Sequence, residues 1–522
     1  MNGFAEYEVL KGLKLKVSAG YTYDSRKQDQ FNNSNTRYGG PTSTDKVNAQ
    51  VTRQERLTWL NENTLTYQTN IKKKHFLNVL GGITFQNSDY EIYSFRTTHI
   101  PNESLGMAGM SEGQAGTTTS AKSSWAMLSY LGRVTYNYMS KYYATVSFRA
   151  DGSSKFNKDN RYGYFPSGSL AWSFSEEEFM KPLKSVLSSG KVRLSWGLTG
   201  NNRIGEYDYY ALLAVLKSRV GSYTSTNSLP SGVYPFDNDA TNAGVVPTSL
   251  PNKDLKWETT EQWNAGLDLG FFDNRLNLSA DLFIRDTKDM LVPGKMLPGV
   301  YGATPPKENA ANLRTKGFEL AVSWYDQFNL GNKPFSYNLS FGLSDSKSVI
   351  TKFDNPMKEF AKSSYYEGMT IGEIWGYKID GLFQTDEEAA AYAKAVDNSY
   401  VCENIFVTAV GDYKGLQAGD PRYVDIDGSG RIDDGEKTAD NRGDMVIIGN
   451  KEPRYLYNAN IGLSWNGIDI SAFFQGVGRQ HRYPDGNNMM FWGGFARPYS
   501  SFVPANFLDN VWSEENPNAY LP

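Results

Sequence analysis

The stretch YNANIGLSWNGIDISAFFQ, residues 457–475, contains two runs of alternating residues on either side of Asn466-Gly467. In each run, apolar side chains recur at every second position, which is the period of a β-strand with one polar and one apolar face. Asn-Gly between two such runs is the strongest short-range signal for a tight hairpin turn. These residues therefore predict an antiparallel β-hairpin.

The same period of two recurs along most of the chain. LKLKVSAGYTY at 13–23 alternates strictly, and so does VRLSWGLT at 192–199. Counting by this rule predicts thirteen strands. They lie near residues 12–23, 57–69, 76–86, 126–138, 142–151, 164–174, 191–200, 259–271, 276–285, 316–326, 335–344, 455–465 and 468–477.

The connections between these strands largely alternate in length. Short turns are expected at 70–75, 139–141, 272–275, 327–334 and 466–467, and long loops at 24–56, 87–125, 201–258, 286–315 and 345–454. Tight turns at one end and extended loops at the other are typical of an up-and-down transmembrane barrel. Aromatic residues near strand ends, such as Tyr136, Trp324 and Trp465, fit the aromatic girdles of such barrels.

A soluble sandwich or propeller is the alternative fold. Strands of about ten residues favour the membrane, because membrane strands need about 9–11 residues and globular strands are usually about 5–6 residues long. We therefore expect an all-β fold, an antiparallel up-and-down transmembrane β-barrel over residues 1–522. Residues 345–454 form its longest loop, which we expect to be extracellular.

Composition narrows the function classes. The chain has 522 residues and a net charge of -4, which favours neither nucleic acid nor an anionic surface. Its single Cys and three His leave little room for thiol or metal catalysis. No run of 18 apolar residues and no signal-peptide pattern occurs. Thirteen is odd, whereas bacterial barrels have even strand numbers, so we expect further strands outside this sequence.

Residues 425–436, DIDGSGRIDDGE, match the twelve-residue calcium loop of an EF-hand. Gly430 occupies the sharp turn of that pattern, and Gly419, Pro421 and Gly443 break the helices that an EF-hand needs on each side. The loop therefore predicts a structural calcium ion without a calcium switch, and an Asp/Gly turn is the alternative. The predicted ligands are Asp425, Asp427, Ser429, Arg431 through its carbonyl, Asp433 and Glu436.

Several longer stretches resemble the SusC/RagA family of TonB-dependent outer-membrane transporters of Bacteroidetes. They include YLGRVTYNYMSKYYATVSFRADGSSKF at 130–156, LKWETTEQWNAGLDLGFFDNRLNLSADLF at 255–283 and GDPRYVDIDGSGRIDDGEK at 419–437. The resemblance covers most of the chain from about residue 57. In the family, the aspartate-rich loop recurs within a long extracellular connection.

The resemblance implies a 22-stranded barrel around a plug domain in the outer membrane of a Gram-negative cell, surrounded by membrane lipid. It also implies import of oligosaccharides or peptides together with a SusD-like surface lipoprotein. Energy would come from TonB, ExbB and ExbD through an N-terminal part that has no counterpart here. The plug and the last strands likewise have none, so this sequence is expected to be the central barrel region.

No catalytic signature stands out, and neither an enzyme nor a further cofactor is expected. The glycine-containing stretches DGSS at 151–154 and GLTGNN at 197–202 lack the helix and the Lys-Ser/Thr pair of a phosphate loop. Loop aromatics could stack on sugar rings, with loop packing as the alternative role. The candidates are Trp257, Tyr301, Trp375, Tyr377 and Phe383. Two other functions stay open, namely a TonB-dependent receptor for a metal chelate and a surface barrel or adhesin that transports nothing.

Overall fold

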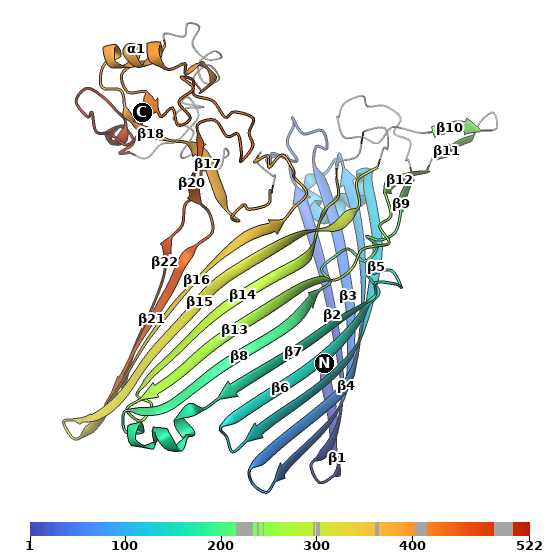
Figure 1. Ribbon diagram of the computed structural model, residues 1–522. Coiled ribbons are helices and arrows are strands. Elements are labelled where there is room, and N and C mark those ends of the chain that lie inside the picture. Colours follow the sequence, from blue (N-terminus) through green and yellow to red (C-terminus); the bar gives the residue numbers. More distant parts are fainter. Residues whose placement is uncertain are drawn as a thin grey trace. The chain divides into compact units, whose positions relative to one another are not determined.

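The computed structural model describes residues 1–215, 233–236, 240–243, 245–295, 298, 303–360, 365–401, 415–484 and 505–522. The chain forms two compact units (Figure 1). Unit 1 comprises Met1–Leu267 and Arg285–Ala310, and unit 2 comprises Asp268–Ile284 and Ala311–Pro522. Among the described residues, no helix is both long and apolar enough to cross a membrane.

Unit 1 contains eight consecutive antiparallel strands that lie side by side in chain order (Figure 1). Tight turns join β3 to β4 and β5 to β6, where Lys72, Lys73, Met139 and Ser140 adopt positive φ. The strands are β1 Asn2–Leu10, β2 Leu13–Asn32, β3 Asn48–Ile71, β4 His75–Thr98, β5 Gln114–Tyr138, β6 Tyr142–Ser153, β7 Tyr162–Trp172 and β8 Leu187–Asn201.

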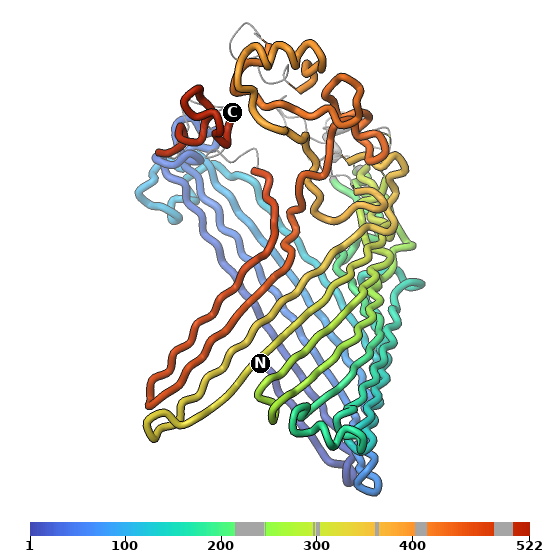
Figure 2. Tube along the Cα trace, turned by 60° about the vertical axis from the view of Figure 1, so that its left-hand side comes forward, coloured from blue at the N-terminus to red at the C-terminus, as the bar shows by residue number. Residues whose placement is uncertain are grey.

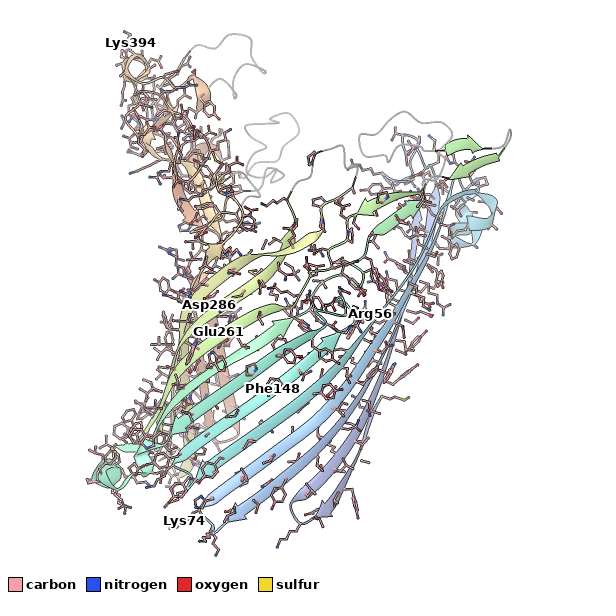
Figure 3. The ribbon with its side chains drawn as sticks, turned by 45° about the vertical axis from the view of Figure 1, so that its right-hand side comes forward. Arg56, Lys74, Phe148, Glu261, Asp286 and Lys394 are labelled. Carbon is pink, nitrogen blue, oxygen red and sulfur yellow. The ribbon has the colours of Figure 1, made fainter. Side chains whose placement is uncertain are left out.

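The register of unit 1 collects apolar side chains on one face of the sheet. Val146 of β6 pairs with Val134 of β5, and Phe148 lies two residues further along the same face (Figure 3). Val146 is 65% exposed and Leu170 of β7 is 62% exposed. On the opposite face, Ser147 and Ser167 share a hydrogen bond of 2.5 Å. An exposed apolar face of this extent is expected in lipid and not in water.

Unit 2 repeats this design with two hairpins. They are β15 Lys307–Leu330, which belongs to unit 2 from Ala311 on, with β16 Lys333–Lys352, and β21 Arg454–Trp465 with β22 Ile468–Arg479. The tight turns of both hairpins lie at the same end (Figure 2). Leu339 pairs with Ile461 on the apolar face, and Asn338 pairs with Gly462 on the polar face. The Asn466-Gly467 turn has φ of 52° and 82°, as a type I′ turn requires.

The remaining strands are short or divided between the units. Residues of β13 Glu258–Phe271 and β14 Leu276–Pro293 belong to both units. The short strands are β9 Leu212–Val215, β10 Val233–Phe236, β11 Ala240–Ala243, β12 Val245–Ser249, β17 Glu373–Tyr377, β18 Ile379–Leu382, β19 Pro421–Tyr423 and β20 Met445–Asn450. One α-helix, α1 Asp386–Ala395, and the 3-10 turns Glu103–Glu112, Phe174–Glu176, Glu178–Leu183 and Leu508–Asn510 complete the described elements.

All thirteen predicted strands are confirmed, and among the described residues one strand of the large sheet, β1, and the short strands β9–β12 and β17–β20 were not predicted. β1 pairs with β2 along Tyr7–Leu15 and Ala5–Val17, and it raises the number of long strands to fourteen. The odd count was therefore an error, and the parity argument built on it fails. Phe4 obscured the alternation because it lies on the polar face of β1, where Lys16 is 4.8 Å from the centre of its ring.

The strands are also longer than the predicted ten residues. β3 and β4 have 24 residues each and β5 has 25. At about 3.3 Å per residue, β5 extends over roughly 80 Å, far more than a bilayer needs. The excess lies at the loop ends, where Arg53 and Glu55 of β3 interrupt the apolar alternation. These ends therefore project beyond the membrane.

We predict that Val146→Arg will destabilise the full-length protein in lipid vesicles by about 2–4 kcal/mol, because the arginine would enter the hydrocarbon near its middle. Val146→Leu, which keeps the position apolar, should change the free energy of unfolding by less than about 0.5 kcal/mol. Urea titrations of both variants measure these values. A neutral Val146→Arg variant would mean that this face meets water.

Candidate functional site

The connection between β16 and β21 contains a folded module within unit 2 (Figure 1). We call residues 353–453 the loop module. Its base is a ribbon of β17 and β20, in which Tyr377 pairs with Met445. A second short ribbon joins β18 to β19. The module therefore has its own secondary structure, whereas one long loop was expected over 345–454.

Helix α1 gives the loop module a small core. Its N-cap is Thr385, whose side chain accepts a hydrogen bond of 3.2 Å from the Glu388 N–H, and three acidic residues fill its first turn. The helix packs Ala389 against Phe383 and Leu416, all of which are buried. A period of two does not predict this helix, because TDEEAAAYAKA carries capping and helix-propensity signals instead.

The aspartate-rich loop adopts a compact turn that orients carboxylates. Both oxygens of Asp425 accept backbone hydrogen bonds, from Gly428 at 2.8 Å and from Gly430 at 2.9 Å. Asp427 accepts from the Ser429 N–H at 2.9 Å, and hydrogen bonds from Ser429 lower the pKa of Asp427. Gly430 has φ of 75°, which confirms the sharp turn that the motif requires.

A third carboxylate, outside the twelve-residue motif, joins this pair. Oxygens of Asp425, Asp427 and Asp444 lie within 4.8 Å of one another. Asp444 is 1% exposed and accepts hydrogen bonds from the N–H groups of Ile426, at 2.6 Å, and Asp433, at 2.9 Å. Three carboxylates at this spacing offer the oxygen ligands that Ca²⁺ prefers.

The other predicted ligands are oriented differently. The Asp433 carboxylate accepts from the Gly435 N–H at 2.8 Å, and the Arg431 carbonyl accepts from the Ser429 hydroxyl at 3.0 Å. Glu436 is exposed. Neither Asp433 nor Glu436 belongs to the carboxylate group. Asp444 lies eight residues beyond the motif, and the one sequence signal for it is an aspartate placed directly before the apolar run of β20.

Three of the candidate stacking residues pack inside the loop module. Trp375 stacks on Phe360 with ring centres 4.3 Å apart and planes at 6°. Tyr377 meets Tyr423 edge-on at 5.8 Å. Burial raises the pKa of Tyr377, and the charges of neighbouring aspartates add to this. Phe383 is fully buried, so its ring presents no face to a ligand in this structure.

The remaining two candidates lie elsewhere in the chain. Trp257 is 7% exposed and packs between Phe156, at 5.2 Å, and Phe165, at 5.5 Å. Its indole N–H donates to the Arg161 carbonyl at 2.9 Å. Tyr301 falls outside the described residues. Trp257 therefore serves the packing of unit 1, which is the alternative role considered from sequence.

An ion pair joins β16 to β21, the two strands that the loop module connects. The guanidinium of Arg454, at the start of β21, donates both to Oδ1 and to Oδ2 of Asp345 in β16. Asp345 also accepts from the Tyr455 N–H at 3.2 Å, and Tyr455 has φ of 56°. The Asp345 side chain is 6% exposed, so removal of either partner would leave a buried charge uncompensated.

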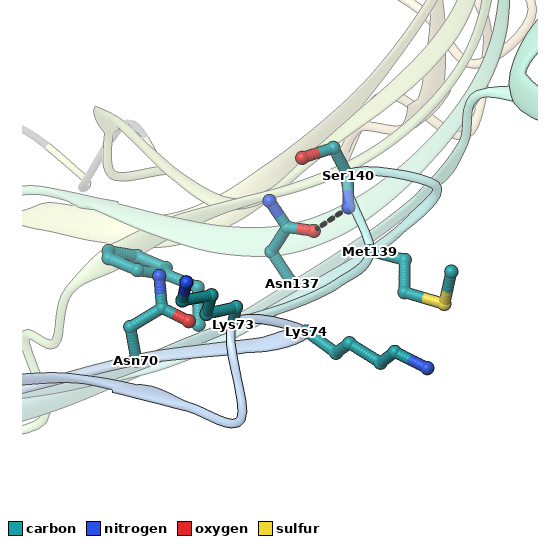
Figure 4. Close-up of a pocket in the computed structure, with 7 residues that line it drawn as sticks. Asn70, Lys73, Lys74, Asn137, Met139 and Ser140 are labelled. Atoms are coloured by element: carbon teal, nitrogen blue, oxygen red, sulfur yellow. Dashed lines mark hydrogen bonds between the residues drawn. The ribbon is translucent and has the colours of Figure 1, made fainter.

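A separate pocket of about 290 Å³ lies at the turn end of unit 1 (Figure 4). Lys73, Lys74 and Phe76 line it together with Asn137, whose side-chain oxygen accepts from the Ser140 N–H at 2.8 Å. Its lining combines two ammonium groups with amide side chains. It contains no pairing of acid, base and nucleophile among the described residues that line it.

Comparisons with known proteins agree on the family. Residues 4–497 match the family of TonB dependent receptor-like β-barrels. TonB-dependent receptor P3 of Formosa agariphila is 30% identical over the whole of this chain and 48% of its own length. TonB-dependent receptor SusC of Bacteroides thetaiotaomicron is 32% identical over 60% of this chain and 28% of its own length. The chain thus spans about half the length, or less, of these two relatives.

A solved structure supports the fold. The RagAB peptide transporter aligns with 100% of this chain and 51% of its own chain, at a TM-score of 0.73 and 21% identity. The family match covers nearly the whole sequence, and its barrel description agrees with the antiparallel strands and exposed apolar faces of both units. This chain therefore belongs to the family of TonB-dependent receptors and contributes strands of an outer-membrane β-barrel.

Proposed function

We propose that the protein of which this chain is a part imports a bulky nutrient across the outer membrane, as a SusC-type transporter. The cargo is an oligosaccharide or a peptide. A SusD-like surface lipoprotein covers the barrel, and TonB with ExbB and ExbD supplies the energy. The family is one of receptors and is not defined by a catalysed reaction, so the mechanism is capture and passage without bond chemistry.

The loop module is the observation that carries this proposal. A channel for passive diffusion needs no folded capture surface, whereas this connection has its own helix, two ribbons and a buried core around Phe383. We infer that it lies outside the cell, because it is opposite the tight-turn end of β15 and β16 in the same unit (Figure 2). A structured surface of this kind suits contact with a lipoprotein partner and with cargo.

The polar faces of the strands support passage of a hydrated cargo. Hydroxyl groups follow one another across neighbouring strands of unit 1, as in the Ser147–Ser167 pair, and Thr135 and Thr145 meet at 3.5 Å. In unit 2 the same face carries Asn338 and Asn458. Such groups exchange hydrogen bonds with water at little cost, which suits the interior of a wet barrel.

We predict that full-length protein extracted from native outer membrane in mild detergent will co-purify with a stoichiometric surface lipoprotein and with a glycan or peptide. Mass spectrometry of the proteins and of the released small molecules measures both. A variant with residues 361–445 replaced by a short glycine-serine linker should insert into the membrane and lose the lipoprotein.

Two outcomes would contradict the importer proposal. Recovery of the barrel with a bound metal chelate and no lipoprotein would favour a chelate receptor. Recovery of a barrel with neither partner nor small molecule, from cells growing on complex nutrients, would favour a surface barrel that transports nothing.

We further propose that the loop module binds one structural calcium ion at Asp425, Asp427 and Asp444. Support comes from the convergence of these three carboxylates, which repel one another unless a cation neutralises them. Both flanking glycines, Gly428 and Gly430, have positive φ and allow the backbone to turn tightly there. The ion would join the motif to the start of β20 and so stiffen the module.

We predict that Asp427→Asn will weaken calcium binding by the full-length protein at least tenfold, while Asp440→Asn will leave it unchanged. Asp440 is an exposed carboxylate that pairs with Lys358 at 2.9 Å, outside the group. Displacement of luminescent Tb³⁺ by Ca²⁺ reports the affinity. Glu436→Gln distinguishes the two possible ligand sets. It should weaken calcium binding if the ligands are those of the twelve-residue motif, and it should have no effect if they are Asp425, Asp427 and Asp444. Equal affinities in all variants would refute the site.

A further inference from the structure

The connection between β7 and β8 carries apolar side chains that the fold does not cover. We call residues 173–186 the β7–β8 turn, and it contains the two 3-10 turns at Phe174–Glu176 and Glu178–Leu183. Phe179 is 65% exposed, Leu183 53% and Val186 49%. Three large apolar groups exposed together in a short turn indicate contact with an apolar phase.

Hydrogen bonds fix the side of the sheet on which this turn lies. The Glu177 carboxylate accepts from the Tyr142 hydroxyl at 2.6 Å and from the Trp172 indole at 3.2 Å. Tyr142 and Trp172 are cross-strand partners, and their side chains belong to the apolar face of unit 1. Glu177 must therefore lie on that face, and it holds the turn against the lipid-facing side of the wall.

The Glu177 carboxylate is shielded from solvent, unlike those of its neighbours Glu176 and Glu178. Lys141 pairs with Glu177 at 3.2 Å, and their side chains are 17% and 15% exposed. Hydrogen bonds from Tyr142 and Trp172 lower the pKa of Glu177. These contacts form a polar network at the aromatic girdle, in which the Glu177 carboxylate accepts hydrogen bonds from three donors, on Lys141, Tyr142 and Trp172.

An apolar groove adjoins this network. Its volume is about 400 Å³, and it shares Tyr142 and Trp172 with the Glu177 contacts. The other lining residues are mostly aliphatic or aromatic, namely Tyr136, Tyr143, Ala144, Leu170, Ala171, Val192 and Leu194. The groove is continuous with the lipid-facing surface of β5 to β8, and it has the chemistry of a seat for an acyl chain.

Besides Glu177, which pairs with Lys141 outside the turn, the turn carries two accessible ion pairs. Lys181 pairs with Glu178 at 2.5 Å, and Lys184 approaches Glu176 at 3.7 Å. All four side chains are at least 46% exposed. Equal numbers of ammonium and carboxylate groups complement a headgroup that carries one phosphate and one ammonium, whereas a purely anionic headgroup would be repelled by the carboxylates.

We propose that the β7–β8 turn and the adjoining groove bind one zwitterionic phospholipid of the phosphatidylethanolamine type, from the leaflet at the tight-turn end. An acyl chain occupies the groove, and Phe179 and Leu183 enter the leaflet beside it. The headgroup meets Lys181, Lys184 and their partner carboxylates. This site is independent of the cargo, since it faces away from the polar side of the wall.

Native mass spectrometry of the full-length protein, titrated with dioleoyl phosphatidylethanolamine in detergent, tests the site. We expect one tightly retained lipid, with at least tenfold preference over dioleoyl phosphatidylglycerol. Ala144→Trp, which fills the groove, should weaken retention at least tenfold. Ala459→Trp is the matched control, because Ala459 lies on the apolar face of unit 2, between Phe341 and Phe474, and lines no part of this groove.

A second variant keeps the proposal testable if Ala144→Trp fails to fold. Glu176→Gln combined with Glu178→Gln changes exposed side chains alone. It should abolish the preference for phosphatidylethanolamine over phosphatidylglycerol, because it removes the carboxylates that repel a purely anionic headgroup. If several lipids bind with equal affinity, and if both variants retain them as the wild type does, lipid covers the apolar face of β5 to β8 non-specifically. There is then no specific lipid site. Loss of retention in the Ala459→Trp control as well would likewise overturn the proposal.

Discussion

Inside a bilayer no water is present to pair with the backbone, so every N–H and C=O group of a membrane strand must bond to the next strand. The ladder between β3 and β4 shows this constraint at work, because it runs without a register shift from Ala49–Thr97 to Ile71–His75. An unbroken register in turn fixes which side chains share a face. The exposed apolar side and the hydroxyl-lined side of each unit both follow from that pairing.

This constraint explains why the sequence reveals the strands inside the membrane so well. Where one face meets lipid, apolar residues must recur at every second position, and all thirteen strands found from that pattern exist. Where the strands leave the lipid, the backbone hydrogen bonds continue, but side chains no longer have to be apolar at every second position. Arg53 and Glu55 of β3 form an ion pair along one strand and carry no periodic signal. Strand ends were therefore underestimated, and β1 was missed because Phe4 breaks its alternation.

The candidate site was predictable to the extent that it is local. Asp425, Asp427 and Gly430 lie within six residues, and their conformation follows from backbone hydrogen bonds inside the turn. Asp444 comes from a different part of the module, and only the folding of the chain brings its carboxylate to the group. The stacking candidate Phe383 is buried for a related reason, since a loop aromatic can either meet a ligand or form the core of the loop itself. In a connection long enough to fold, large aromatic side chains are usually buried in its core.

Near Asp345, the regular pairing of β16 with β21 gives way to the irregular connection between these strands. The pairing of β16 with β21 ends at Ser344–Leu456, and one residue further along β16 the Asp345 carboxylate binds the backbone of Tyr455 and the side chain of Arg454. A positive φ at Tyr455 would be costly alone, at about 1–3 kcal/mol, and the carboxylate offsets it by satisfying the turned N–H. The chain thus leaves the ladder at a point where a side chain replaces the missing strand partner. Beyond Asp345, β16 pairs with β15 as far as Lys352. The connection that follows does not belong to this ladder, and a helix, two ribbons and a carboxylate cluster become possible within it.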